Sequence, residues 1–498
     1  MRRFLDVNSS AACFLFFATG AIFTLSFAPL GCYLLAPLLI LPLLVACLYS
    51  PPRRAARFAF AFGSGLFLFG TYWLYTSIHV FGRAPLWIAI VLMLGLVVIM
   101  SGWFALIGWL TATLTRGRVG RLVLAAPAAW VAVEWFRGWF LTGFPWLSLG
   151  YSQIDSPLAG WLPLGGVYAA SFLAVFSAAA FVMVLATSGR ARRFALALTV
   201  LPWLAGAGLG AVTWSAPARP ALKATIVQGG VSQDRKWLPE QFLPTLRLYR
   251  DSVAAHADSD LILWPEVAIP AVIDEVGDYL DSFQPALQDS GRSLLLGILE
   301  RDNGDIYNSV LMLDGKVRQI YRKRHLVPFG EFFPVPDRVR EWMRLMSLPN
   351  SDMTAGDAEQ PLLTTAKGQQ LAVAICYEDA YGVEQLYALP DATMLINVSN
   401  DAWFGESIAP HQHLEIARVR SLEAGRFTIR ATNNGISAFI GPRGEILQTA
   451  PQFKYATLTA EVTPMGGSTP YAVLGNWPVI GLSVFLILSL ALRRHSHE

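Results

Sequence analysis

The sequence predicts a multi-pass α-helical membrane domain joined to an α/β domain that lies outside the membrane. Three observations support this prediction. Hydrophobic residues make up 54% of the 498 residues and charged residues only 15%, whereas ordinary soluble domains carry about 25% charge. The first 214 residues hold 13 arginines, no lysine and three acids. After about residue 221, long apolar runs give way to short β-rich runs. These features exclude a disordered chain, a coiled coil and a typical cytosolic enzyme.

Apolar runs of membrane-spanning length define the first part. A helix needs roughly 20 apolar residues to cross about 30 Å of hydrocarbon. We expect about eight spans, seven in a membrane domain at residues 1–214 and a C-terminal transmembrane helix at 472–492. The seven runs lie near 11–28, 31–50, 58–76, 85–114, 122–140, 160–187 and 194–214.

Arginine clusters mark alternate loops between these runs. By the positive-inside rule, both termini are expected in the cytoplasm and residues 215–470 in the periplasm of a Gram-negative bacterium. The basic excess is a topology signal, so no nucleic-acid partner is predicted. A cleaved signal peptide is the alternative for the first run, but its loss would spoil the parity. The clusters are Arg2 and Arg3; Arg53, Arg54 and Arg57; Arg116, Arg118 and Arg121; Arg190, Arg192 and Arg193; and Arg493 and Arg494.

Two features of the apolar part have more than one interpretation. Glu134 and Arg137 lie one helical turn apart inside an expected span, where ionisable groups are costly. They either line a polar cavity that contacts a head group or form a structural ion pair that locks helix packing. The run Gly206–Ala211 superficially fits a dinucleotide fingerprint. No strand precedes it, so close helix packing by small residues is the better interpretation.

The outward part, residues 221–465, alternates β-rich runs with amphipathic helical stretches at 239–255 and 414–425. This alternation predicts an α/β or layered α+β domain. The domain is large enough to bury a core of its own. The expected strands are 224–228, 261–264, 293–299, 307–313, 371–376, 393–398, 428–432 and 437–440.

Cys376 is the one cysteine of the outward part, because Cys13, Cys32 and Cys47 lie in expected spans. It therefore has no disulfide partner within that domain. It directly follows a strand-like run at 371–375 and is a candidate nucleophile presented at a strand end. A buried, inert thiol is the alternative, and this residue alone does not decide between them.

A thiol nucleophile needs activation, because the thiolate is the reactive form. A lysine stabilises the thiolate and a carboxylate accepts its proton. Glu266 ends the buried-type strand Leu-Ile-Leu-Trp-Pro-Glu, and Lys323 and Glu331 flank a Pro-Phe-Gly turn. Each charge by itself is better explained as a surface residue, but the three segments together favour a catalytic site.

These segments resemble the carbon–nitrogen hydrolase (nitrilase) superfamily over roughly residues 221–465. The matching motifs are Trp-Pro-Glu266, Tyr-Arg-Lys323-Arg-His and Ile-Cys376-Tyr-Glu-Asp, in the same order and at fitting spacing. The resemblance implies a nitrilase-like αββα sandwich with a Glu–Lys–Cys triad. With about eight spans around it, the chain is similar to the membrane-bound branch of that superfamily, the apolipoprotein N-acyltransferases. Further matching stretches are His325–Glu331, Asn397–Gly405, His411–Ile416 and Thr432–Gly435.

The resemblance also implies catalytic roles. Cys376 is the nucleophile, Glu266 is the general base that takes its proton, and Lys323 stabilises the thiolate and then the oxyanion. Groups this close titrate as a unit. Glu331 resembles the family's second glutamate, which orients the lysine.

Three further residues have expected supporting roles. The backbone N–H of Tyr377 is a candidate oxyanion donor. Glu378 either contacts the acceptor or holds a loop. Trp237 either lies near the site, as a matching tryptophan does in the family, or packs in the core.

The implied reaction has two half-reactions and a Cys thioester between them. No ATP or acyl-CoA is at hand outside the cytoplasm, so the acyl donor is expected to be a phospholipid, with phosphatidylethanolamine as the first candidate. The acceptor implied by the resemblance is the N-terminal α-amino group of a diacylated apolipoprotein. We expect a monomer of the inner membrane, without a cofactor or metal. The alternatives are a membrane-anchored amidase and a catalytically inactive lipid- or lipoprotein-binding protein.

Weaker signals complete the sequence. The aromatic segments 401–404 and 329–333 can form lids, although core or interfacial anchoring is preferred for any single ring. The pair His411 and His413 can suggest a metal site, but no acid or cysteine set completes it, and structural hydrogen bonding is preferred. The absence of a Gly-x-Ser-x-Gly motif disfavours a serine esterase.

Overall fold

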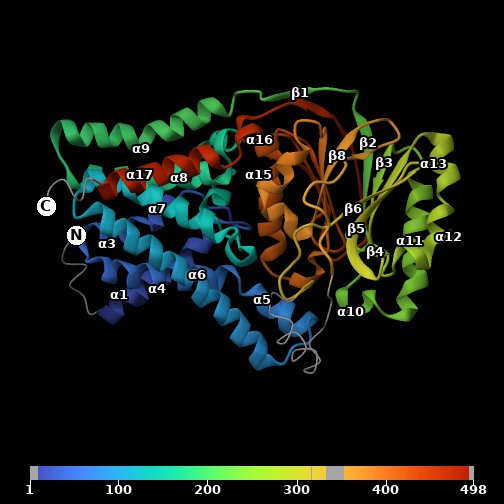
Figure 1. The fold of residues 1–498 in the computed structure, drawn as a ribbon, viewed down its shortest axis with the longest axis horizontal. Coiled ribbons are helices and arrows are strands. Elements are labelled where there is room, and N and C mark those ends of the chain that lie inside the picture. Colours follow the sequence, from blue (N-terminus) through green and yellow to red (C-terminus); the bar gives the residue numbers. More distant parts are fainter. Residues whose placement is uncertain (1–8, 316, 333–352, 493–498) are drawn as a thin grey trace. The chain divides into compact units, whose positions relative to one another are not determined.

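The computed structural model describes residues 9–315, 317–332 and 353–492. The chain forms two compact units (Figure 1). Unit 1 contains Met1–Tyr75, Pro85–Thr213 and Leu474–Glu498, and unit 2 contains Thr76–Ala84 and Trp214–Val473. A short segment from within the apolar part of the sequence therefore belongs to the second unit.

Unit 1 is helical, as the apolar runs predict. Each of the eight expected runs contains a helix, although the run at 31–50 is divided between two. The helices are α1 (Ser9–Phe23), α2 (Leu35–Leu39), α3 (Leu41–Tyr49), α4 (Pro52–Gly70), α5 (Trp73–Tyr75), α6 (Leu86–Thr115), α7 (Val119–Arg137), α8 (Leu162–Ala186), α9 (Gly189–Leu209) and α17 (Trp477–Leu492).

Fewer helices meet the length and hydropathy needed to cross a membrane than the sequence predicts. Within the described residues, three helices are long and apolar enough to cross a membrane: Leu86–Thr115, Val119–Arg137 and Pro157–Ala186. A fourth is added if Pro52–Gly70 and Trp73–Phe81, bent by 50°, form one span. Ser10–Ser26, Leu35–Tyr49 and Trp477–Leu492 are shorter apolar helices. The figure of eight spans is therefore not confirmed, and Arg2, Arg3, Arg493 and Arg494 lie outside the described residues.

Glu134 and Arg137 of α7 hold the turn that follows their helix. Both side chains are buried, and their nearest charged atoms are 4.0 Å apart. Arg137 donates to the carbonyls of Phe144 and Trp146, each at 2.8 Å. Glu134 accepts the backbone N–H of Leu149 at 2.8 Å. These bonds to backbone favour the structural interpretation of the pair over a cavity for a head group.

Unit 2 is built on two mixed sheets in the described part of the chain, each with six strands. The parallel pairs are β2 with β3, β3 with β4, β8 with β9 and β9 with β10. In the first sheet the order is β13 (Ala456–Val462), β2 (Leu222–Gln228), β3 (Leu261–Leu263), β4 (Ser293–Asp302), β5 (Asp305–Leu313) and β6 (Arg318–Arg322). In the second it is β12 (Ile446–Thr449), β11 (Ala438–Ile440), β10 (Thr428–Thr432), β9 (Met394–Ser399), β8 (Gln370–Ile375) and β7 (Leu363–Thr364).

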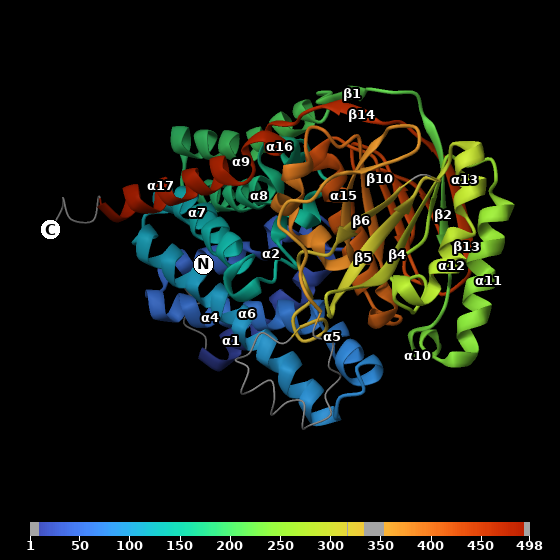
Figure 2. The same ribbon diagram turned by 45° about the vertical axis from the view of Figure 1, so that its right-hand side comes forward.

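Helices cover the outer faces of these sheets and complete four layers (Figure 2). The inner faces share one core, in which Leu263 and Val310 of the first sheet pack with Val373 and Ile396 of the second. Alternate residues such as Ile262 face outward into a second core. Strands buried on both faces require this near-continuous apolar sequence. The covering helices are α11 (Pro239–Ala255), α12 (Gly277–Asp281) and α13 (Gln284–Ser290) on one side and α15 (Ala409–Ala424) on the other; α10 (Gln233–Lys236), α16 (Pro470–Leu474), and the pair β1 (Ser215–Pro217) with β14 (Met465–Gly467) are peripheral.

The layers confirm the αββα arrangement that the resemblance implied. All eight expected strands and both expected helices are present, although the strand predicted to include Cys376 ends one residue earlier. The pattern missed β6, β7, β12 and β13, which are short, exposed or only partly buried, and it missed the pair β1 and β14.

Segment Thr76–Ala84 packs within unit 2 through η3 (Thr76–Phe81), a turn of π-helix. Its Ser77 hydroxyl donates to the carbonyl of Trp403 at 2.9 Å. The ring of Phe81 meets the ring of Trp403 edge to face at 6.5 Å. The segment thus holds η10 (Asp401–Phe404), the turn that follows strand β9.

Candidate active site

Three strand ends bring the predicted triad together. Glu266 lies just beyond β3, Lys323 directly follows β6, and Cys376 directly follows β8. Electrostatic coupling joins the Cys376 thiol to both Glu266 and Lys323. Each of the three side chains therefore lies at or just beyond the point where the regular hydrogen bonding of a strand stops.

The Glu266 carboxylate is buried and fully engaged. Its Oε1 accepts the side-chain N–H of Asn308 at 2.7 Å and lies 3.5 Å from Nζ of Lys323. Its Oε2 accepts the backbone N–H of Asn400 at 2.7 Å. Donors on both oxygens hold the carboxylate in one orientation, as a general base requires.

Lys323 is 1% exposed and contacts two carboxylates. Its Nζ lies 2.8 Å from Oε1 of Glu331 as well as 3.5 Å from Glu266. Burial by itself would lower the pKa of Lys323, but the negative charges of Glu331 and Glu266 outweigh it and raise the pKa above its usual value. The lysine is therefore a fixed positive charge. Glu331 is held in turn by the backbone N–H of Val327 at 2.8 Å.

Cys376 occupies a strained turn between β8 and η8 (Cys376–Ala380). Its φ of 52° lies in the left-handed region that non-glycine residues rarely adopt. Burial and the charge of Glu266 raise the pKa of the thiol well above its usual value, against the lowering effect of Lys323. This shift favours the protonated thiol over the thiolate.

The residues that follow the nucleophile shape the turn. The Tyr377 ring meets those of His325 and Tyr381 edge to face. Glu378 is fully buried and accepts N–H groups of Ile375 at 2.6 Å and Arg324 at 2.7 Å, together with the Tyr321 hydroxyl at 3.0 Å. These contacts favour the loop-holding role of Glu378 over contact with an acceptor.

Trp237 follows α10 and is 53% exposed, which excludes its alternative role in the core. The neighbouring Lys236 is buried, and its Nζ lies 3.3 Å from the backbone carbonyl of Glu266. The tryptophan is therefore a surface ring next to a residue that contacts the backbone of Glu266.

Two asparagines of the site were missed by sequence reasoning. Asn308 in β5 donates from one Nδ2 to Glu266 at 2.7 Å and to Glu331 at 3.0 Å, so it joins both carboxylates. Asn400 supplies its backbone N–H to Glu266. A polar residue inside the otherwise apolar strand at 307–313 was the available signal for Asn308.

A second network lies on the other side of the nucleophile. His413 lies 2.9 Å from Asp401 through Nδ1 and 3.1 Å from the carbonyl oxygen of Cys376 through Nε2. Asp401 also accepts from Arg430 at 2.8 Å. His411 instead contacts Gln452 at 3.1 Å, which favours the hydrogen-bonding interpretation of the two histidines.

The atoms of this network also test for a metal site. The Sγ of Cys376, an oxygen of Asp401 and a ring nitrogen of His413 lie within 4.8 Å of one another. The carboxylate and the imidazole already bind each other, and Arg430 adds a positive charge, so the set is better suited to a hydrogen-bonded network than to a cation.

Aromatic side chains near the site are partly exposed. Trp403 is 40% exposed and Phe329 is 51% exposed, which makes both available as surface rings. Phe333, at the end of the other expected lid, lies outside the described residues. Lid movement therefore stays a prediction.

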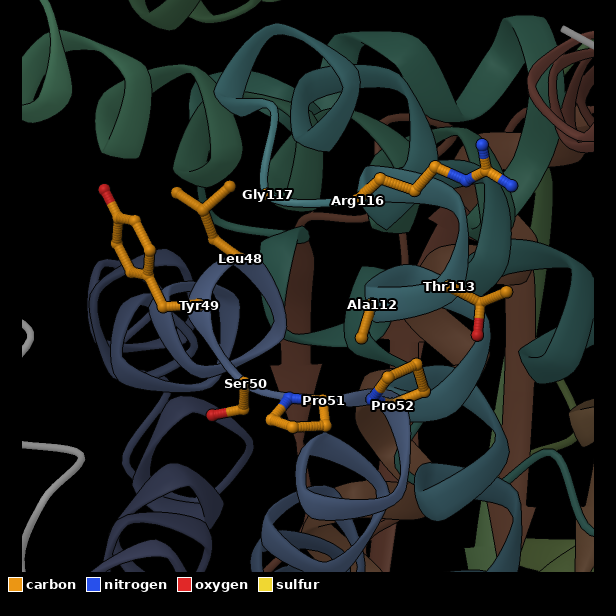
Figure 3. Close-up of a pocket in the computed structure, with 9 residues that line it drawn as sticks. All are labelled: Leu48, Tyr49, Ser50, Pro51, Pro52, Ala112, Thr113, Arg116 and Gly117. Atoms are coloured by element: carbon orange, nitrogen blue, oxygen red, sulfur yellow. The ribbon is translucent and has the colours of Figure 1, made fainter. Parts of the chain in front are cut away.

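A cavity of about 460 Å³ lies in unit 1 and contains none of these groups (Figure 3). The Arg116 side chain extends away from the prolines at its floor. No triad residue contributes to it, so the chemistry cannot be assigned there. Its lining residues are Leu48, Tyr49, Ser50, Pro51, Pro52, Ala112, Thr113, Arg116 and Gly117.

Two family models match successive parts of the sequence. Residues 19–180 match the apolipoprotein N-acyltransferase N-terminal domain. Residues 223–471 match the carbon-nitrogen hydrolase family, and this segment includes Glu266, Lys323 and Cys376.

Relatives named apolipoprotein N-acyltransferase match nearly the whole chain. One from Azotobacter vinelandii is 42% identical, covering 97% of this chain and 95% of the relative. One from Methylococcus capsulatus is 39% identical, covering 96% and 95%. One from Pseudomonas aeruginosa is 41% identical, again covering 96% and 95%.

Proposed function

The chain belongs to the apolipoprotein N-acyltransferase family, and from this membership we propose that it transfers a fatty acyl chain from a phospholipid to the N-terminal α-amino group of a diacylated apolipoprotein. The observation that carries the mechanism is the cluster of Glu266, Lys323 and Cys376, with Lys323 Nζ 3.5 Å from Glu266. It supports covalent acyl transfer through a cysteine.

In the first half-reaction, Cys376 attacks the ester carbonyl of the donor as Glu266 takes the thiol proton. The charge that develops on the carbonyl oxygen is stabilised by Lys323 and by the N–H of Tyr377. The ester C–O bond then breaks, and Glu266 returns the proton to the leaving oxygen. The products are a thioester on Cys376 and a lysophospholipid.

In the second half-reaction, the acceptor amine attacks the thioester carbonyl. Glu266 takes a proton from the amine, the C–S bond breaks, and the thiol is restored as the amide forms. Exchange of a thioester for an amide runs downhill, so no energy-rich cofactor is required. One covalent intermediate between two substrates predicts ping-pong kinetics.

The donor and acceptor classes follow from chemistry and compartment. We infer a phospholipid donor, because phospholipids are acyl esters already present in the membrane. Phosphatidylethanolamine is the first candidate. Both substrates are lipids, which accounts for a hydrolase-like domain in a chain rich in apolar helices. We also propose a monomer of the bacterial inner membrane.

For the topology we retain eight spans, seven in a membrane domain at residues 1–214 and one at 472–492, with residues 221–465 as a periplasmic catalytic domain. Thr76–Ala84 is the exception within the first range, because it belongs to unit 2. Both termini are then cytoplasmic. The support is the arginine clusters in alternate loops and the helix within each apolar run. Shorter apolar helices such as α1 would span with local thinning of the bilayer.

The test is intact mass spectrometry of the detergent-purified protein after incubation with phosphatidylethanolamine. We expect a fatty-acyl adduct that neutral hydroxylamine removes and that moves to the amine of an added diacylglyceryl-cysteine peptide. Cys376→Ala abolishes the adduct, whereas Cys32→Ala, at an exposed free cysteine, retains it.

Other results would favour the alternatives. An adduct that is released only by water supports an amidase-like hydrolase. Absence of an adduct while lipid binds, with wild-type behaviour of Cys376→Ala, supports a lipid-binding protein.

A further inference from the structure

The imidazole of His413, on α15, lies against the nucleophile turn and has no part in the mechanism above. The side chain is 1% exposed. Its Nε2 is 3.1 Å from the carbonyl oxygen of Cys376, and its Nδ1 is 2.9 Å from Oδ1 of Asp401. The ring therefore connects a buried carboxylate to the backbone of the nucleophile.

Both of these partners are hydrogen-bond acceptors. A carbonyl oxygen can only accept. Burial would raise the pKa of Asp401, but the positive charges of Arg430 and His413 outweigh it and hold that pKa well below its usual range, so Asp401 is a carboxylate. Its oxygens also accept from Ser399 at 2.7 Å and Arg430 at 2.8 Å.

These acceptors determine the protonation of the ring. A neutral imidazole has one N–H and one lone pair. The lone pair would then face either the Asp401 carboxylate or the Cys376 carbonyl. Two lone pairs that face each other in a buried site repel. Protons on both nitrogens satisfy both contacts, so His413 is an imidazolium paired with Asp401.

The carbonyl that His413 holds belongs to the same peptide plane as the N–H of Tyr377. The cis peptide bonds of the described chain lie at Ala28-Pro29 and Leu389-Pro390, so this peptide is trans. In a trans peptide the C=O and N–H point in opposite directions. A charged hydrogen bond on the carbonyl therefore fixes the direction of the Tyr377 N–H and polarises it.

We propose that His413 is a positioning residue which, as an imidazolium held by Asp401, aims and strengthens the Tyr377 N–H through the carbonyl of Cys376. The inference rests on the proposed function, in which that N–H stabilises the oxyanion. The φ of 52° at Cys376 shows why the turn needs such a restraint. The positive charge also lies close to the thiol, since a ring nitrogen of His413 is within 4.8 Å of Sγ.

Charged groups reach the imidazolium from several elements. Asp401 comes from η10, Asp379 from η8 and Arg430 from β10. Burial raises the pKa of Asp379, while Arg430 and His413 lower it. Arg420 of the same helix also acts on Asp379. Beyond the Cys376 thiol lie Glu266 and Lys323.

The experiment uses full-length protein in detergent with p-nitrophenyl butyrate, which acylates a reactive cysteine and releases nitrophenolate. This ester does not depend on a phospholipid being the natural donor. The rate constant of acylation and the KM are measured from pH 6 to 10 for wild type, His413→Ala, His413→Gln and His411→Gln. His411 lies on the same helix but contacts Gln452, so it is the matched control.

We expect His413→Ala to lower acylation about 100-fold, comparable to loss of an oxyanion donor, with KM changed less than about threefold. His413→Gln keeps an N–H for the carbonyl without the charge, so we expect a loss of about 10-fold. Wild type and His411→Gln are expected to be acylated at the same rate. His413→Gln supplies the readout if His413→Ala does not fold.

The proposal is overturned if His413→Gln acylates at the control rate. It is also overturned if the rate falls only in proportion to a rise in KM, because that pattern indicates a general loss of structure. Failure of the proposed function gives a different result. Wild type is then acylated by the nitrophenyl ester but never by phosphatidylethanolamine, while the acylation rates of the His413 variants can still be compared with that of the control.

Discussion

Gly297 of strand β4 lies so close to Glu266 that a β-carbon on the glycine would be 2.5 Å from the Cα of Glu266. It would also be 2.6 Å from the carbonyl oxygen of Pro265. Both obstacles are backbone atoms, which cannot rotate out of the way as a side chain can. The position of Glu266 therefore depends on the absence of a side chain on the neighbouring strand.

Gly297→Ala is expected to displace Glu266 and to lower the acylation rate. Misplacement of a catalytic group by about 1 Å can cost about 100-fold, and overpacking is expected to destabilise the fold by about 1–3 kcal/mol. Single-turnover mass spectrometry and thermal unfolding measure the two effects. Gly277→Ala is the control, because its added β-carbon meets open space. Equal rates for the two variants would contradict the prediction.

Asn308→Ala is expected to lower acylation by about 10- to 100-fold, because misplacement of a catalytic group by about 1 Å can cost about 100-fold. The variant removes the side-chain amide whose Nδ2 donates to both Glu266 and Glu331 beside Lys323. Donor KM should stay near wild type, because no substrate contact is removed. Asn303→Ala, in an exposed turn where the amide contacts Asp302, serves as the comparison and should leave the rate unchanged.

Lys236 is expected to make the protein more stable as the pH rises above neutrality. Burial lowers its pKa from 10.5 to about 8, against the raising effect of Glu266. Between these values the unfolded chain binds more protons than the folded one, so the free energy of unfolding increases with pH, by about 3 kcal/mol in total. The midpoint of thermal unfolding in detergent should rise across this window.

Lys236→Met separates this effect from the rest of the protein. The variant should have a higher midpoint at pH 7 and should lose the rise above pH 8, because the buried ammonium is gone. Lys367→Met, which removes a half-exposed lysine, should keep the wild-type profile. A rise of the same size in both variants would assign the pH dependence to other groups.

Ser77→Ala is expected to loosen the turn η10. The variant removes the hydrogen bond to the Trp403 carbonyl, which stabilises by about 0.5–1.5 kcal/mol net. Amide exchange in residues 401–405 should therefore be faster by about 3- to 10-fold. Hydrogen–deuterium exchange with peptide mass spectrometry measures this, with Ser282→Ala as a hydroxyl control in the same unit. Amide protection equal to that of wild type would show that the Ser77 hydrogen bond does not stabilise the turn.

The sequence located two of the candidate site residues through the strands that precede them. Glu266 and Cys376 each come just after an apolar run whose residues are buried on both faces. Lys323 follows the partly exposed β6, which the pattern did not identify. Its assignment depended on the resemblance and not on periodicity.

Residues that act through tertiary contacts could not be predicted in this way. Asn308 looks like an ordinary strand residue until β5 is placed beside Glu266 and Glu331. The charge of His413 depends on Asp401 and on a backbone carbonyl of another element. The hydrophobic pattern of a strand or helix indicates which of its faces is buried. It does not indicate which polar side chains come into contact in the folded protein.

The position of Thr76–Ala84 has a consequence for how such a chain can be divided or recombined. Unit 2 is not encoded by one continuous stretch of the gene, because this segment is translated well before β2. The ribosome therefore completes this segment long before it reaches Trp403, and the contact between them can form only after Trp403 has been synthesised. A hydrolase domain grafted in from another chain would arrive without its own counterpart of Ser77 and Phe81. The two halves of the gene are therefore expected to change together and not to be exchanged as independent cassettes.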